Sequence, residues 1–370
     1  MLRGALSYVF GKRGQRRVQS LRLFYRLRME ILIHLEGPLR ALTRRTEVRL
    51  WVDGREAFPR LEKLLRRARH TIIIQMYIWK DDRVGRWFAG ILLDAADRGV
   101  HIDVTKEAVG DVFEFRDFLT TQASMEPLWR HFWNHPNIRI THVTRNDHTK
   151  VFVIDDQILL LTGMNIADEY EESWHDYMVE LRGHRFVAQY LMEGAPQPGK
   201  VQLILNTQRV RQVRGAVMHL LSSAQRSILI EQCYFSDPKV VDLLIRRSHE
   251  GVRITLIVPE AQDLHYHANM QAIGRLLVGS SPGCVQVLLY PGIVHGKVIL
   301  ADRTRMFLGS ANLMASSLDE QGEACVLVDG YRIALGKLRE VLRGDILKGR
   351  PLVSPPQFRW LGRWLAWIGL

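Results

Sequence analysis

The sequence predicts an α/β protein built from two similar halves. Three observations support this prediction: a motif of reactive side chains occurs twice, a strand, helix and strand pattern precedes each copy, and a segment with Pro and Gly separates the copies. Duplication on this scale predicts two halves related by a pseudo-twofold axis, the intramolecular form of a symmetric dimer. A site that uses both motifs must then lie where the halves meet.

The repeated motif is His-x-Lys-x4-Asp, followed by an asparagine and an acid. In both copies the asparagine lies 17 residues after the histidine, and the acid lies 28 residues after it. The positions are His148, Lys150, Asp155, Asn165 and Asp176 in the first copy and His295, Lys297, Asp302, Asn312 and Glu323 in the second. Five positions that match at the same offsets are too specific a pattern to be coincidence.

Each motif is expected to begin a buried strand. Side chains alternate along a strand, so the single intervening residue places the histidine and the lysine on the same face. The residues that follow, 151–154 and 298–301, are all apolar, which is typical of a strand covered on both faces. Such a strand would give the two polar side chains the rigid support that catalysis requires.

The elements before the motifs follow one order in both halves. A short strand at 47–51 and an amphipathic helix at 58–68 open the first half. A strand, a helix and a second strand then follow, at 71–78, 85–98 and 100–105 in the first half and at 227–234, 239–248 and 252–258 in the second. This order predicts parallel pairing of the flanking strands, and it places Tyr77 and Tyr234 at matching positions.

The segment 193–199, which contains Pro196 and Pro198, marks the junction between the halves. The predicted domains are a basic segment at 1–46, a first half at 47–195, a second half at 200–345 and a Trp-rich tail at 346–370.

The composition indicates a globular protein with a large core, because 47% of the 370 residues are hydrophobic. Cys233, Cys284 and Cys325 show no paired or metal-type spacing, which favours a reducing compartment over a disulfide framework.

The two ends of the chain carry a pattern of basic and apolar residues. The net charge is +12, and residues 1–46 hold eleven Lys or Arg against two acids. A basic amphipathic helix there would suit an anionic membrane surface; a helix docked on the core and an arm that binds nucleic acid are the alternatives. Near the C-terminus, Trp360, Trp364 and Trp367 share one helical face, which suits either the bilayer interface or a packed terminal helix.

No apolar run approaches the roughly 18–20 residues needed to span a bilayer, and the first residues lack the apolar stretch and cleavage site of an export signal. We therefore expect a protein that is neither integral nor exported.

The duplicated motif resembles the signature of the phospholipase D superfamily, and the surrounding sequence is similar to its bacterial cardiolipin synthase branch. The segments that carry the second likeness are 75–77, 162–165, 174–176 and 309–312. The resemblance covers about residues 47–330 and implies two β-α-β-α halves with mixed sheets and an active site at their interface. Many cardiolipin synthases carry two N-terminal membrane spans, so the chain resembles the subgroup without them.

The resemblance implies a phosphodiester transfer by two histidines. One neutral imidazole attacks phosphorus, and the other, protonated, donates to the departing oxygen. Family precedent makes His148 the nucleophile and His295 the acid, although the symmetry of the motifs does not distinguish them. Lys150 and Lys297, helped by the amides of Asn165 and Asn312, would bind the non-bridging oxygens.

The acids are expected to orient the histidines. In the family the carboxylate partner comes from the opposite half, which pairs His148 with Glu323 and His295 with Asp176. Asp155 and Asp302 are expected to be structural supports, because seven residues of strand place them about 20 Å from their histidines.

No cofactor is expected, and no metal is expected in the site because two lysines would repel a cation. The other histidines, such as His131, His135 and His142, are expected to have ordinary structural roles.

The expected function is that of a phosphatidyltransferase that makes a cardiolipin-type phospholipid from phosphatidylglycerol or a related donor, on the cytoplasmic face of the inner membrane. A phospholipase D that forms phosphatidic acid, a superfamily nuclease and a binding protein without catalysis are the alternatives. Two segments depart from the branch, Val104–Gly110 and Met314–Ser317, the second where Asp-x-Arg-Ser is usual. These departures bear on head-group and acceptor choice. The segment Met125–Trp133 is expected to be a packed amphipathic helix or, alternatively, part of an acceptor pocket.

Overall fold

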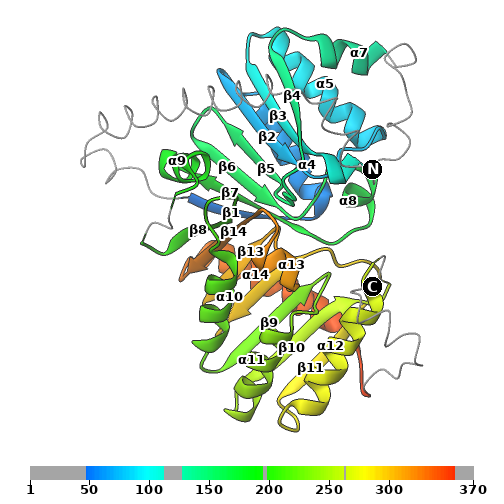
Figure 1. The fold of residues 1–370 in the computed structure, drawn as a ribbon, viewed down its shortest axis with the longest axis vertical. Helices are drawn as coiled ribbons and strands as arrows, with labels where there is room; N and C mark the ends of the chain where they lie inside the picture. The colour runs from blue at the N-terminus through cyan, green and yellow to red at the C-terminus, as the bar shows by residue number, and fades with distance from the viewer. Residues whose placement is uncertain (1–46, 112–126, 195–197, 262–263, 355–370) are drawn as a thin grey trace.

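The computed structural model describes residues 47–111, 127–194, 198–261 and 264–354 (Figure 1). The predictions for the basic segment at 1–46 and for the tryptophans of the tail lie outside these residues. Among the helices of the described ranges, none is both long enough and apolar enough to cross a membrane.

The first half forms a seven-stranded mixed sheet. In sheet order its strands are β1 (Glu47–Val52), β7 (Tyr177–Arg182), β6 (Ile158–Thr162), β5 (Val151–Ile154), β2 (Thr71–Met76), β3 (His101–Glu107) and β4 (Ile138–Val143). Strands β2, β3 and β4 are parallel to one another, and the other pairs are antiparallel. Its helices are α4 (Asp53–Leu65), α5 (Arg83–Asp97), α6 (Ala108–Asp111), α7 (Pro127–Asn134), α8 (Asp168–Glu172) and α9 (His184–Met192).

The second half forms an eight-stranded mixed sheet. In sheet order its strands are β15 (Arg350–Pro351), β11 (Val285–Tyr290), β10 (Arg253–Pro259), β9 (Ser227–Gln232), β12 (Lys297–Ala301), β13 (Arg305–Gly309), β14 (Glu323–Asp329) and β8 (Val201–Asn206). Strands β9, β10 and β11 are parallel, as β2, β3 and β4 are in the first half. Its helices are α10 (Val213–Ser222), α11 (Pro238–His249), α12 (Tyr266–Gly279), α13 (Ala315–Asp319) and α14 (Arg332–Lys348).

The two sheets face each other across a shared apolar core. Val151 and Val153 of β5 belong to this core together with Val298 and Leu300 of β12, so the motif strands of both halves meet there. The opposite face of each sheet packs against its own helices, α4 and α5 in the first half and α10, α11 and α12 in the second (Figure 1). Because both faces are covered, every residue of β5 and β12 is buried, as their apolar sequence predicted.

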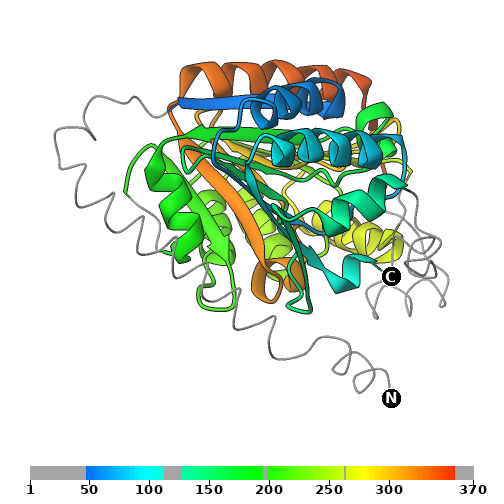
Figure 2. The same ribbon diagram turned by 90° about the horizontal axis from the view of Figure 1, so that it is seen from above.

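One helix of the second half also closes against the first. Helix α14 lies along β1 (Figure 2), where Lys337 forms an ion pair with Glu56 of α4 at 2.6 Å. The duplicated α/β fold with mixed sheets is therefore confirmed, as is the parallel pairing of the strands in each β-α-β unit. The helix predicted at 58–68 begins earlier, at Asp53, where the Glu56 carboxylate accepts the Val52 N–H at 2.6 Å.

Candidate active site

Backbone hydrogen bonds between the halves bring each histidine to an acid of the opposite motif. The His148 N–H donates to the Gly322 carbonyl at 2.9 Å, and the His295 N–H donates to the His175 carbonyl at 2.7 Å. Gly322 and His175 each directly precede an acid of the repeated motif. The same crossed connection therefore occurs twice, as the pseudo-twofold relation requires.

Both histidines contact a carboxylate through Nδ1. His148 Nδ1 lies 3.2 Å from Glu323 Oε1, and His295 Nδ1 lies 2.6 Å from Asp176 Oδ2. These are the two pairs expected from the sequence. Since an ionised carboxylate only accepts hydrogen bonds, the proton of each neutral ring sits on Nδ1 and the Nε2 lone pair is the one that can react.

The two motif lysines are buried at the start of the strands. Lys150 is fully buried, and its ammonium donates to the His148 carbonyl at 2.7 Å and lies 5.1 Å from the centre of the Tyr77 ring. Lys297 donates to the His295 carbonyl, and its ammonium lies 2.8 Å from His295 Nδ1 and 3.2 Å from Nε2. Burial holds the pKa of Lys150 well below its usual value, although the Glu323 charge opposes this. An anion at this position would therefore favour the charged ammonium.

The pKa shifts differ between the His148–Glu323 pair and the His295–Asp176 pair. Burial and the charge of Lys150 lower the pKa of His148, with Glu323 only partly opposing them, so its ring is neutral at pH 7. Burial alone would raise the pKa of Glu323, but its interactions with His148 and Lys150 bring it below its usual value. Burial raises the pKa of Asp176 to about 6, against the charge of Lys297. A neutral His148 beside an ionised carboxylate has the form that a nucleophile needs.

Two serines that the sequence analysis did not single out as functional hold Glu323. The hydroxyls of Ser310 and Ser317 donate to its two carboxylate oxygens, and Ser317 also accepts the Asn312 N–H at 2.9 Å. The departure from the family wording at Met314–Ser317 thus retains a hydroxyl at its last position.

The matching positions in the first half are Gly163 and Tyr170, which differ in chemistry. A Cβ atom at Gly163 would lie 2.5 Å from both oxygens of Asp176, so a serine there has no room. The Tyr170 hydroxyl instead accepts from the Asn165 amide at 2.6 Å. Because neither serine recurs at the same offset in the first half, the duplication gave no signal for either of them.

The motif asparagines brace loops in this structure. Asn165 Oδ1 accepts the Ile78 N–H at 3.1 Å while its amide donates to Tyr170. Asn312 is buried, and its Oδ1 has no hydrogen-bond partner among the described residues. Their expected contact with phosphate oxygens stays a prediction.

The motif aspartates lie at the far ends of the strands. The Asp155 carboxylate accepts the N–H groups of Arg69, His70 and Thr71 at 2.8 to 3.1 Å. The Asp302 carboxylate accepts the N–H groups of Gln225, Arg226 and Ser227, which lie before and at the start of β9, at 2.7 to 3.2 Å. Each aspartate therefore ties the end of a motif strand to the start of its neighbour, the arrangement expected of a structural support.

Aromatic rings surround the two histidines. Tyr77 packs edge-on against His148 with ring centres 5.0 Å apart, and His295 packs against both Tyr170 and Trp174, with both ring centres 5.2 Å away. The predicted match between Tyr77 and Tyr234 is wrong. The strand pairing makes Gln75 of the first half equivalent to Glu231 of the second, so Tyr77 is equivalent to Cys233. Tyr234 packs on His265 instead. A shift of one residue in a strand moves a side chain to the other face.

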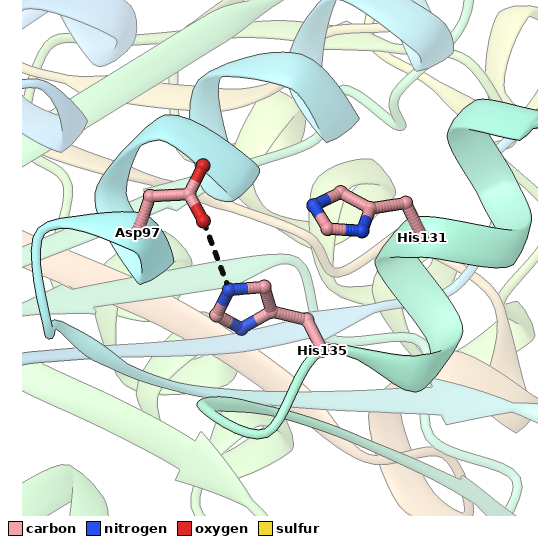
Figure 3. A group of neighbouring side chains, drawn as sticks. All are labelled: Asp97, His131 and His135. Carbon is pink, nitrogen blue, oxygen red and sulfur yellow. Dashed lines mark hydrogen bonds and ion pairs between the residues drawn. The ribbon is translucent and has the colours of Figure 1, made fainter.

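Two histidines outside the motifs, His131 and His135, form a surface group with Asp97 (Figure 3). His135 Nδ1 accepts the Asn137 N–H at 3.1 Å, which leaves the ring proton on Nε2, facing Asp97 Oδ1 at 3.1 Å. The backbone N–H of Asn137 occupies Nδ1 and the proton on Nε2 faces Asp97, so His135 offers no lone pair to this group and does not fit a metal ion despite the spacing of the histidines. His142 stacks on Trp133 with ring centres 5.7 Å apart, and the helix that carries Trp133 packs on the first half, as expected for this segment.

The comparisons with known proteins agree with this arrangement. The model of the family described as cardiolipin synthase, PLD-like domain matches the chain twice, over residues 61–193 and 217–342. The chain belongs to this family. It is accordingly an enzyme of the phosphatidyltransferase or phospholipase D type.

Relatives of this cardiolipin synthase-like protein have modest sequence identity. Cardiolipin synthase B of Shigella flexneri is 28% identical over 317 residues, which cover 76% of each chain. The major cardiolipin synthase ClsA of Bacillus subtilis is 24% identical and covers 80% of this chain and 68% of its own. The crystal structure of phosphatidylserine synthase from Haemophilus influenzae superposes with a TM-score of 0.64 at 14% identity, covering 82% of this chain and 87% of the other. At that identity the structural likeness supports the fold alone.

Proposed function

We propose that this protein is a phosphatidyltransferase that makes a cardiolipin-type phospholipid from phosphatidylglycerol or a related donor. The observation that carries the proposal is the pair of buried histidine and carboxylate contacts built across the two halves, each beside a buried lysine. Each pair takes its histidine from one half and its acid from the other. Neither half, 47–195 or 200–345, is therefore expected to be active alone.

In the first step His148 Nε2 attacks the phosphorus of the donor lipid. The bond from nitrogen to phosphorus forms, the bond from phosphorus to the glycerol head group breaks, and His295 gives its proton to the departing oxygen. Lys150 and Lys297 compensate the charge on the non-bridging oxygens. Glu323 stabilises the positive charge that His148 acquires, because its pKa keeps it ionised.

In the second step His295 removes a proton from the hydroxyl of an acceptor phosphatidylglycerol. That oxygen attacks phosphorus, and the bond to His148 breaks. Water in place of this hydroxyl would give phosphatidic acid, so transfer requires that the acceptor be held close and water excluded. The names of the sequence relatives, cardiolipin synthases from two organisms, favour the lipid acceptor.

We propose that the enzyme works as a peripheral protein at an anionic membrane surface, with the basic segment at 1–46 as one attachment. That segment carries eleven of the basic residues against two acids. Exposed charges are screened within roughly 8 Å at physiological ionic strength, so salt should weaken the attachment. Sedimentation with phosphatidylglycerol vesicles should show loss of binding in high salt and in a chain lacking 1–46. Equal binding by both chains would contradict this attachment.

The function is tested by incubating the purified chain with phosphatidylglycerol vesicles and identifying the products by mass spectrometry. We expect a lipid with two phosphates and free glycerol as the main products, with phosphatidic acid minor. EDTA should leave turnover unchanged, because lysines supply the positive charge. Dominant phosphatidic acid would indicate a hydrolase, and cleavage of DNA with the lipid intact would indicate a nuclease.

A further inference from the structure

A second group of ionisable side chains lies buried where the halves meet, outside the repeated motifs. It consists of His175 in the loop before β7, Glu231 in β9 and Asp345 in α14, which are 6%, 0% and 1% exposed. The first residue belongs to one half and the other two belong to the other. The reaction described above uses none of these three side chains.

The spacing of the three side chains suits ligands around one cation. His175 Nε2 lies 3.3 Å from Asp345 Oδ2 and 3.6 Å from Glu231 Oε1. These distances are too long for good hydrogen bonds. Ligands bound at about 2.0–2.2 Å around a tetrahedral ion are separated by roughly 3.3–3.6 Å, which is the spacing found here.

The carboxylates point into the group without satisfying each other. Three carboxylate oxygens have no hydrogen-bond partner of good geometry among the described residues: both oxygens of Glu231 and Oδ2 of Asp345. Ionised carboxylates buried in this way are costly unless a positive charge compensates them. A divalent ion beside a neutral histidine would balance the two charges.

An acid also lies behind the ring of this histidine. His175 Nδ1 lies 2.7 Å from Asp53 Oδ1 and Nε2 faces the two carboxylates, so a bound ion on the Nε2 side would leave the ring proton on Nδ1. A second carboxylate behind a histidine ligand is the usual support in metal sites. The Tyr177 hydroxyl lies 2.9 Å from Nε2 and would turn away when an ion takes that lone pair. In the surface group of Figure 3, by contrast, His135 carries its proton on Nε2.

We propose that His175, Glu231 and Asp345 bind a divalent transition-metal ion of the class of Zn²⁺ or Mn²⁺, which ties the two halves together behind the active site. One imidazole and two carboxylates suit such an ion. The His175 carbonyl accepts the N–H groups of His295 and Gly296 at 2.7 and 3.0 Å. The ion would therefore stabilise the junction of the two halves beside Asp176 and His295 while taking no part in the transfer itself, and turnover would persist without it.

The test uses the full chain produced in medium supplemented with Zn²⁺ or Mn²⁺ and, separately, in metal-depleted medium. We expect a stoichiometric ion in the desalted protein by elemental analysis, and a higher Tm for the loaded than for the depleted protein. Glu231→Gln and Asp345→Asn should each lose the ion and the difference in Tm. His131→Ala, which alters the group of Figure 3, should keep both.

Three results would overturn the proposal. The first is wild-type protein that is free of metal after supplementation, with the same Tm in both media, which would mean that protons neutralise the group. The second is an ion that is lost in His131→Ala and kept in Glu231→Gln, since it would belong to the surface. The third is an ion kept at full occupancy in Asp345→Asn, which decides the question even if Glu231→Gln does not fold. Turnover from phosphatidylglycerol is measured separately, so failure of the proposed function and failure of this site are distinct outcomes.

Discussion

Replacing Glu323 by glutamine should slow the reaction while leaving the fold intact. Glutamine has the same shape, and the hydroxyls of Ser310 and Ser317, which donate to the carboxylate, can rotate to accept from the new amide. The contact with His148 Nδ1 at 3.2 Å then lacks its negative charge. The positive charge that develops on His148 during attack is left without compensation.

The size of the effect follows from the value of that contact. A hydrogen bond to a charged group contributes about 1.5–3 kcal/mol. Each 1.36 kcal/mol corresponds to a factor of ten in rate, so we expect kcat/KM for Glu323→Gln to fall by about 10- to 150-fold. The assay is the initial rate of two-phosphate lipid formation from phosphatidylglycerol vesicles, with circular dichroism to verify folding.

Glu180→Gln is the matched control. Glu180 is a buried glutamate of β7 that pairs with Arg60 at 2.8 Å and with Arg182 at 2.7 Å. Its replacement should lower stability, because it leaves two guanidinium groups without their carboxylate, yet leave the rate per folded molecule unchanged. A loss of rate in Glu323→Gln no larger than in this control would refute the orienting role of Glu323.

Three further predictions concern the motif residues. His148→Ala and His295→Ala should each abolish turnover, but only His295→Ala should accumulate acid-labile phosphate on the protein; phosphate trapped on His295 and never on His148 would reverse the two roles. Asp155→Ala should lower the free energy of unfolding by about 1–3 kcal/mol in urea denaturation, because three backbone N–H groups lose their acceptor, with turnover per folded molecule retained. The pKa of His148 is lowered from 6.5 in the folded protein, chiefly by burial, so the acid limb of kcat/KM that reports this ring should be centred below pH 6.5, and an acid limb centred above pH 6.5 would contradict this. The same shift means that the contribution of His148 to stability is complete above pH 6.5 and is lost as the pH falls through the folded pKa.

The sequence by itself determined the duplicated fold and the residues of the two motifs. Both depend on features that are visible along the chain: a fixed spacing of reactive residues, the apolar runs 151–154 and 298–301, and the β-α-β order before each motif. The pairing of His148 with Glu323 also required the resemblance to a family, because no local pattern says that an acid comes from the opposite half.

Only the tertiary structure decided how the two pairs differ. Ser310 and Ser317 converge on Glu323 because a tight turn and a short helix bring them there, whereas Gly163 leaves no room for a hydroxyl beside Asp176. The mistaken match of Tyr77 with Tyr234 has a similar cause, since the register of a strand is fixed by its hydrogen-bonded neighbours.

The buried group of His175, Glu231 and Asp345 was also beyond the sequence. Its members are 56 and 114 residues apart along the chain and come from a loop, a strand and a helix. Their contact depends on the packing of one half against the other. Burial then makes their charges costly in free energy, and no pattern along the chain shows that cost.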